Sequence, residues 1–237
     1  MVSSALLLGA QQHDDGPQPR VVTPGTTAAA PPSDAVVLFD GRDLSNWART
    51  DGQPARCKVD QGAIACTSGA GDIQTKQKFR DAQIHLEFSP PNMPDQHGQM
   101  RGNSGVYLLG QYEVQILDSF KNPTYADGSL GGLYGQAPPL VNAARPPGEW
   151  QTYDIVFHPP KCDAQGAVTA KGTVTVILNG ILVQDHVTIR NTKGGCGPGP
   201  LLLQDHSGFE NAPVTTMRFR NVWYRPLDVP SLPEKPE

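Results

Sequence analysis

The sequence predicts an all-β protein, built as an antiparallel β-sandwich of the jelly-roll type. Short apolar runs alternate with turn signals along most of the chain, a pattern typical of sandwiches and barrels. The 237 residues include 25 glycines and 23 prolines, which favour many turns, and no segment has the pattern of an amphipathic helix. Because a sandwich commonly uses a chain of this length as a single domain, we expect one large domain.

About ten strands are expected, in the order in which the apolar runs occur. Each run is bounded by glycine, proline, asparagine or aspartate, and Asn179-Gly180 is the strongest hairpin signal among these boundaries. The predicted strands and hairpins cover residues 36–39, 57–66, 73–78, 83–88, 106–109, 112–117, 150–157, 174–178, 181–187, 201–204 and 217–224.

The two ends of the chain are expected to lie outside the folded domain. Residues 5–10 resemble the end of the apolar core of a signal peptide, although no Lys or Arg precedes them. Residues 11–35 carry almost no large apolar side chain, which is typical of a disordered linker. We therefore assign residues 1–35 to a signal-like remnant and linker, residues 36–227 to the domain, and residues 228–237 to a proline-rich tail.

The overall charge excludes some classes of partner. A formal net charge of −4 leaves no basic excess, so nucleic acid is not an expected partner. No apolar run approaches the roughly 20 residues that a membrane-spanning helix needs, so no integral membrane span is expected. Composition carries no information on the oligomeric state.

The four cysteines predict two disulfide bonds. None belongs to a CxxC pair, which speaks against a zinc finger. Cys57 and Cys66 flank a turn signal at residues 60–62, so their sulfur atoms would meet across a hairpin. We predict the disulfides Cys57–Cys66 and Cys162–Cys196, with four buried free thiols as the alternative. Disulfides and the signal-like start together favour an extracytoplasmic location, either periplasmic or secreted.

A predicted hairpin over residues 101–119 concentrates polar side chains. Glu113 and Gln115 share one face of its second strand, while apolar residues occupy the other face. The turn of this hairpin is expected at Gly110-Gln111. Asp118 lies an odd number of residues from Glu113, so its side chain reaches the face of Glu113 only if a bulge intervenes. A plain solvated face is the alternative explanation. The crowded polar residues are Arg101, Asn103, Ser104, Glu113, Gln115 and Asp118.

Two other strands carry polar pairs of matching parity. His85 and Glu87 are two residues apart in one strand, and Gln204 and His206 are two apart at the end of another. If these strands neighbour the hairpin, the two pairs would line one concave surface together with its polar face. His85, Glu87 and His206 would then suit one divalent metal ion as a set of two histidines and one carboxylate. Ordinary surface positions are the alternative for each of these residues.

Several sequence blocks, in this order, resemble the 3-keto-disaccharide hydrolase family. The resemblance covers about residues 36–227 and implies a concanavalin A-like jelly roll. The chain departs from the family just before Tyr134, where many relatives have a cysteine and this chain has none. The blocks are FDGRDLSNW (39–47), HLEF (85–88), RGNSGVYLLGQYEVQILDS (101–119), PPGEWQTYDIVFHPP (146–160), VILNGILVQDH (176–186), LLLQDH (201–206) and FRNVWYRPL (219–227).

The resemblance implies an enzyme that cleaves glycosides whose sugar ring carries a ketone at C3, either by proton abstraction, elimination and hydration or by direct hydrolysis. Such chemistry needs a base near C2, an electrophile for the enolate oxygen and an acid near the glycosidic oxygen. No nucleotide cofactor is expected. The expected catalytic residues are His85, Glu87 and Glu113, and the expected substrate-binding residues are Arg101, Asn103, Ser104, Gln115, Asp118, Tyr134 and Gln204.

Two other functions fit the same fold. A non-catalytic carbohydrate-binding module would use a similar jelly roll, but it would need aromatic platforms and would tolerate the loss of carboxylates. A laminin-like adhesion domain would leave the polar face unused. The many carboxylates and few aromatics, which make up 7% of the chain, favour the enzyme.

Overall fold

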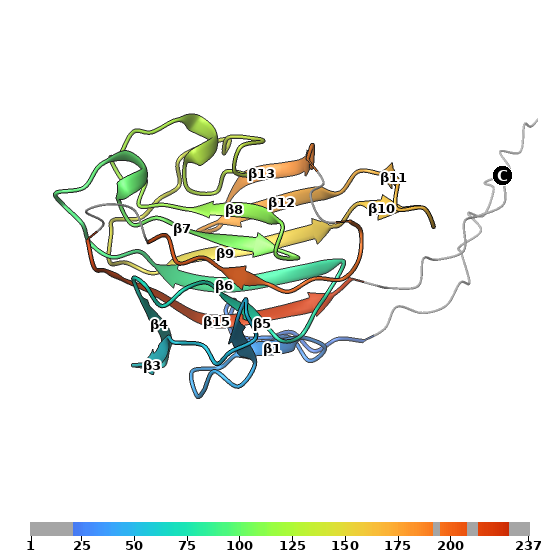
Figure 1. The fold of residues 1–237 in the computed structure, drawn as a ribbon, viewed down its shortest axis with the longest axis horizontal. Helices are drawn as coiled ribbons and strands as arrows, with labels where there is room; N and C mark the ends of the chain where they lie inside the picture. Colours follow the sequence, from blue (N-terminus) through green and yellow to red (C-terminus); the bar gives the residue numbers. More distant parts are fainter. Residues whose placement is uncertain (1–20, 192–194, 208–212, 228–237) are drawn as a thin grey trace, which may run out of the picture.

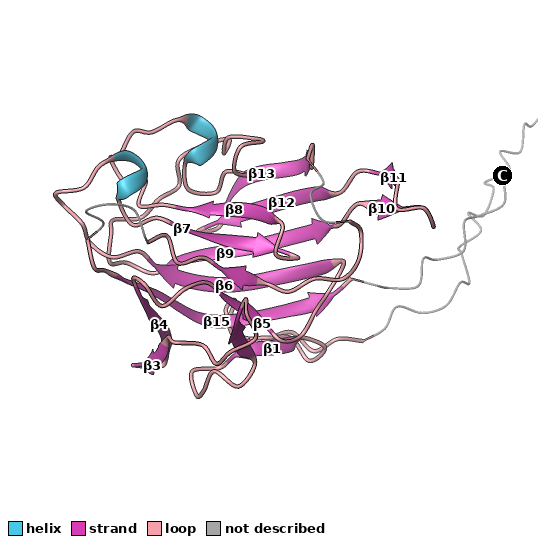
Figure 2. Cartoon of the chain, in the orientation of Figure 1, coloured by secondary structure: helices cyan, strands magenta, loops and turns pink. Residues whose placement is uncertain are grey.

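Two antiparallel sheets pack face to face in the computed structural model, which describes residues 21–191, 195–207 and 213–227. Strands dominate this part of the chain, and helix is confined to two short 3-10 turns (Figure 2). The elements are β1 (Val36–Phe39), β2 (Trp47–Arg49), β3 (Lys58–Asp60), β4 (Ala63–Thr67), β5 (Ile73–Thr75), β6 (Ala82–Ser89), η1 (Gly98–Met100), β7 (Ser104–Leu108), β8 (Tyr112–Ile116), η2 (Ala126–Gly128), β9 (Gln151–His158), β10 (Lys161–Cys162), β11 (Val168–Ala170), β12 (Thr173–Leu178), β13 (Ile181–Thr188), β14 (Leu202–Leu203) and β15 (Thr216–Pro226).

The strands divide unequally between the two sheets. The large sheet has the order β13-β12-β9-β6-β15-β4-β3, and β1 also pairs with β15. Its long strands run side by side across the molecule (Figure 1). The small sheet has the order β2-β5-β14-β7-β8, and β10 and β11 form a separate hairpin. The predicted all-β sandwich is therefore confirmed, and β2, β10 and β11 are strands that the sequence did not predict.

The core lies between the two sheets and explains which side chains face outward. Alternate residues of β6, such as Ile84 and Leu86, belong to the core, as do Val106 of β7 and Val114 of β8. Because successive side chains of a strand point to opposite faces, the residues between these positions lie on the outer faces of the sandwich. The predicted parity of Glu113 and Gln115, opposite to Val114, is confirmed.

The turns of two predicted hairpins agree with their predicted positions to different degrees. Asn179 and Gly180 both have positive φ, as the Asn-Gly signal between β12 and β13 requires. In the β7–β8 hairpin, the residues with positive φ are Leu109 and Gly110, so this turn begins one residue earlier than predicted. A leucine at positive φ carries no sequence signal, which explains the shift.

Both predicted disulfides are present. Cys57 and Cys66 close the β3–β4 hairpin, and Cys162 and Cys196 join the β10 strand to the segment before β14. Within the described residues no cysteine is free. The alternative of four buried thiols is therefore excluded.

The long segment 119–149 is folded against the small sheet. Leu133 forms a bridge with Val114, and the backbone N–H of Tyr134 donates to the carbonyl of Glu113 at 3.0 Å. The segment thus continues the small sheet beyond its edge strand β8. The Nε2 atom of Gln184 on β13 donates to the Gly131 carbonyl at 3.0 Å and fixes the segment to the large sheet.

Residues 21–35, which the sequence assigned to the linker, make specific contacts with β15. The indole Nε1 of Trp223 donates to the Ala29 carbonyl at 3.0 Å, and Arg225 pairs with Asp34 at 2.8 Å. The signal-like residues 5–10 and the tail 228–237 lie outside the described residues. Among the helices of the described part, none has the length and apolar character needed to cross a membrane.

Candidate functional site

The outer face of the small sheet carries two rows of side chains that run across its strands. Strand register places Tyr107 opposite Glu113 and Gly105 opposite Gln115, and Leu202 pairs with Tyr107. The same register continues through β5, β14 and the segment after β8, and it gives two rows. The first row consists of Gln74, Leu202, Tyr107, Glu113 and Tyr134. The second row consists of Asp72, Gln204, Gly105, Gln115 and Gly132. The first row holds the Glu113 carboxylate and the aromatic rings, and the second holds amides, glycines and the Asp72 carboxylate.

The carboxylate of Glu113 lies over Gly105. A Cβ atom at Gly105 would come within 2.4 Å of Glu113 Oε1 and within 2.9 Å of Tyr107 Cε2, so only glycine leaves room for this carboxylate. Gln204 Nε2 donates to the Tyr107 hydroxyl at 3.0 Å. Burial, together with the neighbouring Glu113 charge and hydrogen bond, raises the pKa of Tyr107, so its hydroxyl stays protonated and donates to Glu113.

An amide cluster borders this carboxylate. Asn103 Nδ2 donates to the Gln99 carbonyl at 2.9 Å, and Gln115 Nε2 donates to Gln99 Oε1 at 3.1 Å. Among the described residues, Oε1 of Gln115 and Oε1 of Gln204 are buried and have no hydrogen-bond partner. A buried acceptor without a partner is costly, so both amides retain an unused capacity to accept a hydrogen bond.

Two tyrosines stand at the edge of the face, beside Glu113. The hydroxyls of Tyr125 and Tyr134 are 2.7 Å apart, and their rings meet edge to face with centroids 6.3 Å apart. Their exposed fractions are 50% and 40%, which makes both rings accessible for stacking on a sugar. Gly128 allows this arrangement, because a Cβ there would lie 2.1 Å from Tyr125 Cε2.

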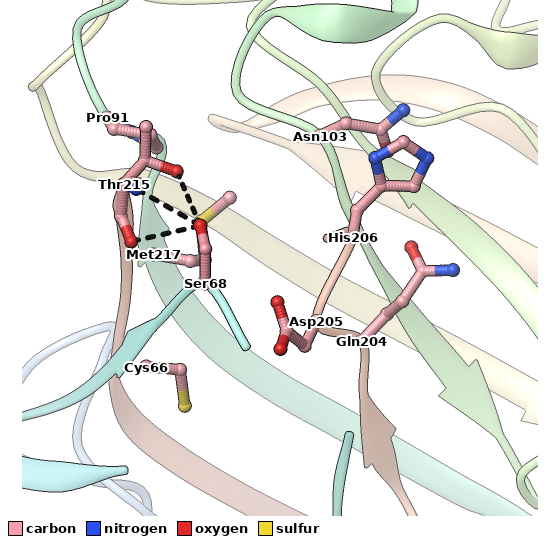
Figure 3. A pocket seen from close by; sticks show the side chains of 9 residues that line it. All are labelled: Cys66, Ser68, Pro91, Asn103, Gln204, Asp205, His206, Thr215 and Met217. Carbon is pink, nitrogen blue, oxygen red and sulfur yellow. Dashed lines mark hydrogen bonds between the residues drawn. The ribbon is translucent and has the colours of Figure 1, made fainter. Parts of the chain in front are cut away.

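A small cavity adjoins the other end of the second row. Figure 3 shows Asn103, Gln204 and His206 along one side of it and Ser68, Thr215 and Met217 along the other. Burial lowers the pKa of His206, so its imidazole is neutral at neutral pH. The volume is about 20 Å³, which is too small for a sugar ring.

His85 and Glu87 do not join this face. Both lie on β6 of the large sheet and point away from the core, and therefore away from the small sheet. His85 stacks on Trp223 with ring centroids 5.2 Å apart, and its Nδ1 is 2.7 Å from Asp154 Oδ1. Glu87 accepts from Arg220 at 2.6 Å. The prediction that His85 and Glu87 line one surface with Glu113 is wrong, because β6 belongs to the other layer.

The predicted metal set fails for the same reason. His206 follows β14 in the small sheet, whereas His85 and Glu87 lie on the outer face of the large sheet. In the part of the chain that the structure describes, no three His, Cys, Asp or Glu side chains come together in a way that could hold a metal ion. These three residues therefore cannot share one ion.

Three predicted substrate-binding residues instead build the walls of the site. Arg101 Nε pairs with Asp118 Oδ2 at 2.6 Å, so Arg101 is paired with Asp118 and not with Glu113. The side chain of Asp118 is almost fully buried. Ser104 is fully buried, and its hydroxyl donates to the Gln204 carbonyl at 2.7 Å. Asn103, Gln115, Tyr134 and Gln204, by contrast, surround the Glu113 carboxylate or the adjoining cavity.

The sequence predictions missed three residues of the site. Tyr107 shares the parity of Glu113 across the hairpin, so the predicted register contained the signal that places it there. Gln99 lies in the short 3-10 turn η1 and Tyr125 directly precedes η2, and neither turn is long enough for a periodic pattern to show which way a side chain points.

Comparisons with known proteins agree with this fold. The family model of the 3-keto-alpha-glucoside-1,2-lyase-like domain matches residues 34–225. A Parabacteroides distasonis ATCC 8503 protein of known crystal structure is 43% identical in sequence to this chain. Only its name assigns that protein to the glycosyl hydrolases. The match has a TM-score of 0.82 and covers 92% of this chain and 95% of that one.

More distant structures share the fold alone. A second Parabacteroides distasonis protein with the same assignment by name is 19% identical, with a TM-score of 0.59 and coverage of 82% of this chain and 94% of that one. A third is 21% identical, with a TM-score of 0.55 and coverage of 81% and 99%. No curated protein matches the chain. The family match spans most of the chain and the nearly full-length structural match supports it, so the chain belongs to the 3-keto-alpha-glucoside-1,2-lyase-like family.

Proposed function

We propose that the protein is an exported enzyme that cleaves glycosides whose sugar ring carries a ketone at C3. The observation that carries this proposal is the hydrogen-bonded chain of Gln204, Tyr107 and Glu113. It holds one carboxylate against a neutral phenol on an outer sheet face. A ketone at C3 acidifies the hydrogen on C2, because the resulting carbanion is an enolate. The aglycone at C1 can then leave by elimination.

In this reaction Glu113 is the base that removes the proton from C2. Proton uptake neutralises the Glu113 carboxylate, so it attracts the Tyr107 hydroxyl less strongly. That hydroxyl can then donate to the enolate oxygen, which carries the charge that develops in the transition state. Both events use groups that already touch in the resting site.

The surrounding groups would hold the sugar. The buried Oε1 atoms of Gln115 and Gln204 accept hydrogen bonds from ring hydroxyls, and Asn103 offers a further amide group. Tyr134, at the open edge of the face, supplies a ring on which the sugar can stack. Carbohydrate is thus the proposed partner of this face.

The two disulfides support the proposed export. Structural disulfides persist in oxidising environments such as the periplasm or the extracellular space. Cys57–Cys66 and Cys162–Cys196 therefore support export.

The test is the release of 4-nitrophenolate from a 4-nitrophenyl 3-keto-α-glucoside, with the parent glucoside as the control substrate. We expect release from the 3-keto substrate alone, and exchange of the C2 hydrogen with deuterium when the reaction runs in D₂O. A parallel reaction with EDTA tests the need for a divalent ion. If a panel of 3-keto-glycosides binds but undergoes neither release nor exchange, the protein is a binding module and the proposal fails.

A further inference from the structure

The small cavity beside His206 is suited to water. Its volume of about 20 Å³ exceeds the roughly 10–15 Å³ that one buried water needs and leaves no room for a sugar. The lining is mainly polar and includes Asn103, Gln204 and His206.

Gln204 connects this cavity to the proposed base. Its Nε2 atom donates to the Tyr107 hydroxyl at 3.0 Å, and that hydroxyl bonds to Glu113. Two side chains, Gln204 and Tyr107, thus connect the cavity to the group that would remove the proton from C2. Asp205 holds the wall in place, because its Oδ2 accepts from the backbone N–H groups of Gly69 and Gly71 at 2.9 and 2.7 Å.

We propose that this cavity binds the water that hydrates the unsaturated sugar left by elimination, and that His206 is the base for this second step. The inference rests on the proposed function. The water oxygen forms a bond to C1, the C1–C2 π pair moves into the enolate, and His206 takes the proton from the water. Glu113 then returns its proton to C2, which regenerates the carboxylate, and His206 releases its proton to solvent. The net reaction is hydrolysis.

A neutral imidazole is needed for this role. Burial lowers the pKa of His206 from its ordinary value of 6.5, so the neutral form is present at and below neutral pH. The charged groups beside it include Asp205, which acts in the opposite direction. Hydration should therefore decline only when the pH falls through this lowered pKa.

The experiment separates the two steps in one reaction. Release of 4-nitrophenolate reports elimination, and the vinyl proton at C1 in the NMR spectrum reports the unsaturated sugar. In the wild type we expect hydrated 3-keto sugar to appear together with the phenolate. In His206→Gln we expect hydration to slow about a hundredfold, so unsaturated sugar accumulates while phenolate release continues.

Two further variants keep the test independent of folding defects. Thr215→Leu fills the cavity from the side opposite His206 and should also cause unsaturated sugar to accumulate. His186→Gln, at an exposed position on β13, is the matched control and should behave as the wild type. Thermal unfolding of each variant checks the fold.

Three outcomes would overturn the proposal. An unchanged product ratio in both His206→Gln and Thr215→Leu would show that the cavity does not supply the water. A wild-type reaction that yields only unsaturated sugar would show that the protein is a lyase without a hydration step. Absence of phenolate release from the wild type would instead remove the proposed function, and this inference with it.

Discussion

Replacing Gly105 with alanine tests the position of the Glu113 carboxylate. The new Cβ atom would lie 2.4 Å from Glu113 Oε1, whereas real Cβ contacts stay beyond 3.0 Å, so the carboxylate must retreat by at least about 0.6 Å. The Tyr107 ring, at 2.9 Å, must also shift. Because a misplacement of about 1 Å can cost about a hundredfold in rate, we expect kcat to fall about tenfold to a hundredfold.

The fold should tolerate this change. The nearest atoms to the new Cβ belong to the side chains of Glu113 and Tyr107, and Gly105 does not have positive φ. The expected result is therefore a loss of kcat on a 3-keto-glucoside with little change in the unfolding temperature. Gly197→Ala is the control, because nothing lies within 4 Å of its added Cβ and its φ is also not positive. Wild-type kcat in Gly105→Ala would refute the placement of the base.

Three further variants test other contacts. Tyr107→Phe removes the hydroxyl between Gln204 and Glu113 and should lower kcat about a hundredfold in steady-state assays. An unchanged kcat would show that this hydroxyl has no role in catalysis. Asp118→Ala leaves Arg101 without its buried partner and should lower the free energy of unfolding by about 3 to 5 kcal/mol in urea titrations. A loss below about 1 kcal/mol would contradict a structural role for Asp118. Replacing both Cys162 and Cys196 with serine opens a loop with a sequence separation of 34 and should cost about 4 kcal/mol in the same assay. No loss would mean that this disulfide is dispensable.

Sequence periodicity predicted the elements of the fold well. Alternating apolar residues identified β6, β9, β12 and β15 because each strand buries one face against the other sheet. The same alternation assigned Glu113 to an outer face. Periodicity therefore determines whether a side chain points inward or outward.

Parity alone does not specify which sheet a strand joins. His85 and Glu113 both point outward, but β6 and β8 belong to different sheets, so the two side chains lie on opposite outer faces. Gln99 lies in the short 3-10 turn η1 and Tyr125 directly precedes η2, and only the folded chain brings them to the site. The resemblance to a family supplied the expected chemistry but did not correct the sheet assignment.

The most direct test compares Glu113 and Glu87, the two carboxylates for which the sequence predicted the same catalytic role. Glu113→Gln and Glu87→Gln are to be assayed for phenolate release from the same 3-keto-glucoside, with unfolding curves for both. We expect Glu113→Gln to lose about a thousandfold in kcat with its fold intact. Glu87→Gln should keep wild-type kcat and lose stability through its contact with Arg220. Full activity in Glu113→Gln, or an inactive but folded Glu87→Gln, would contradict the proposed site.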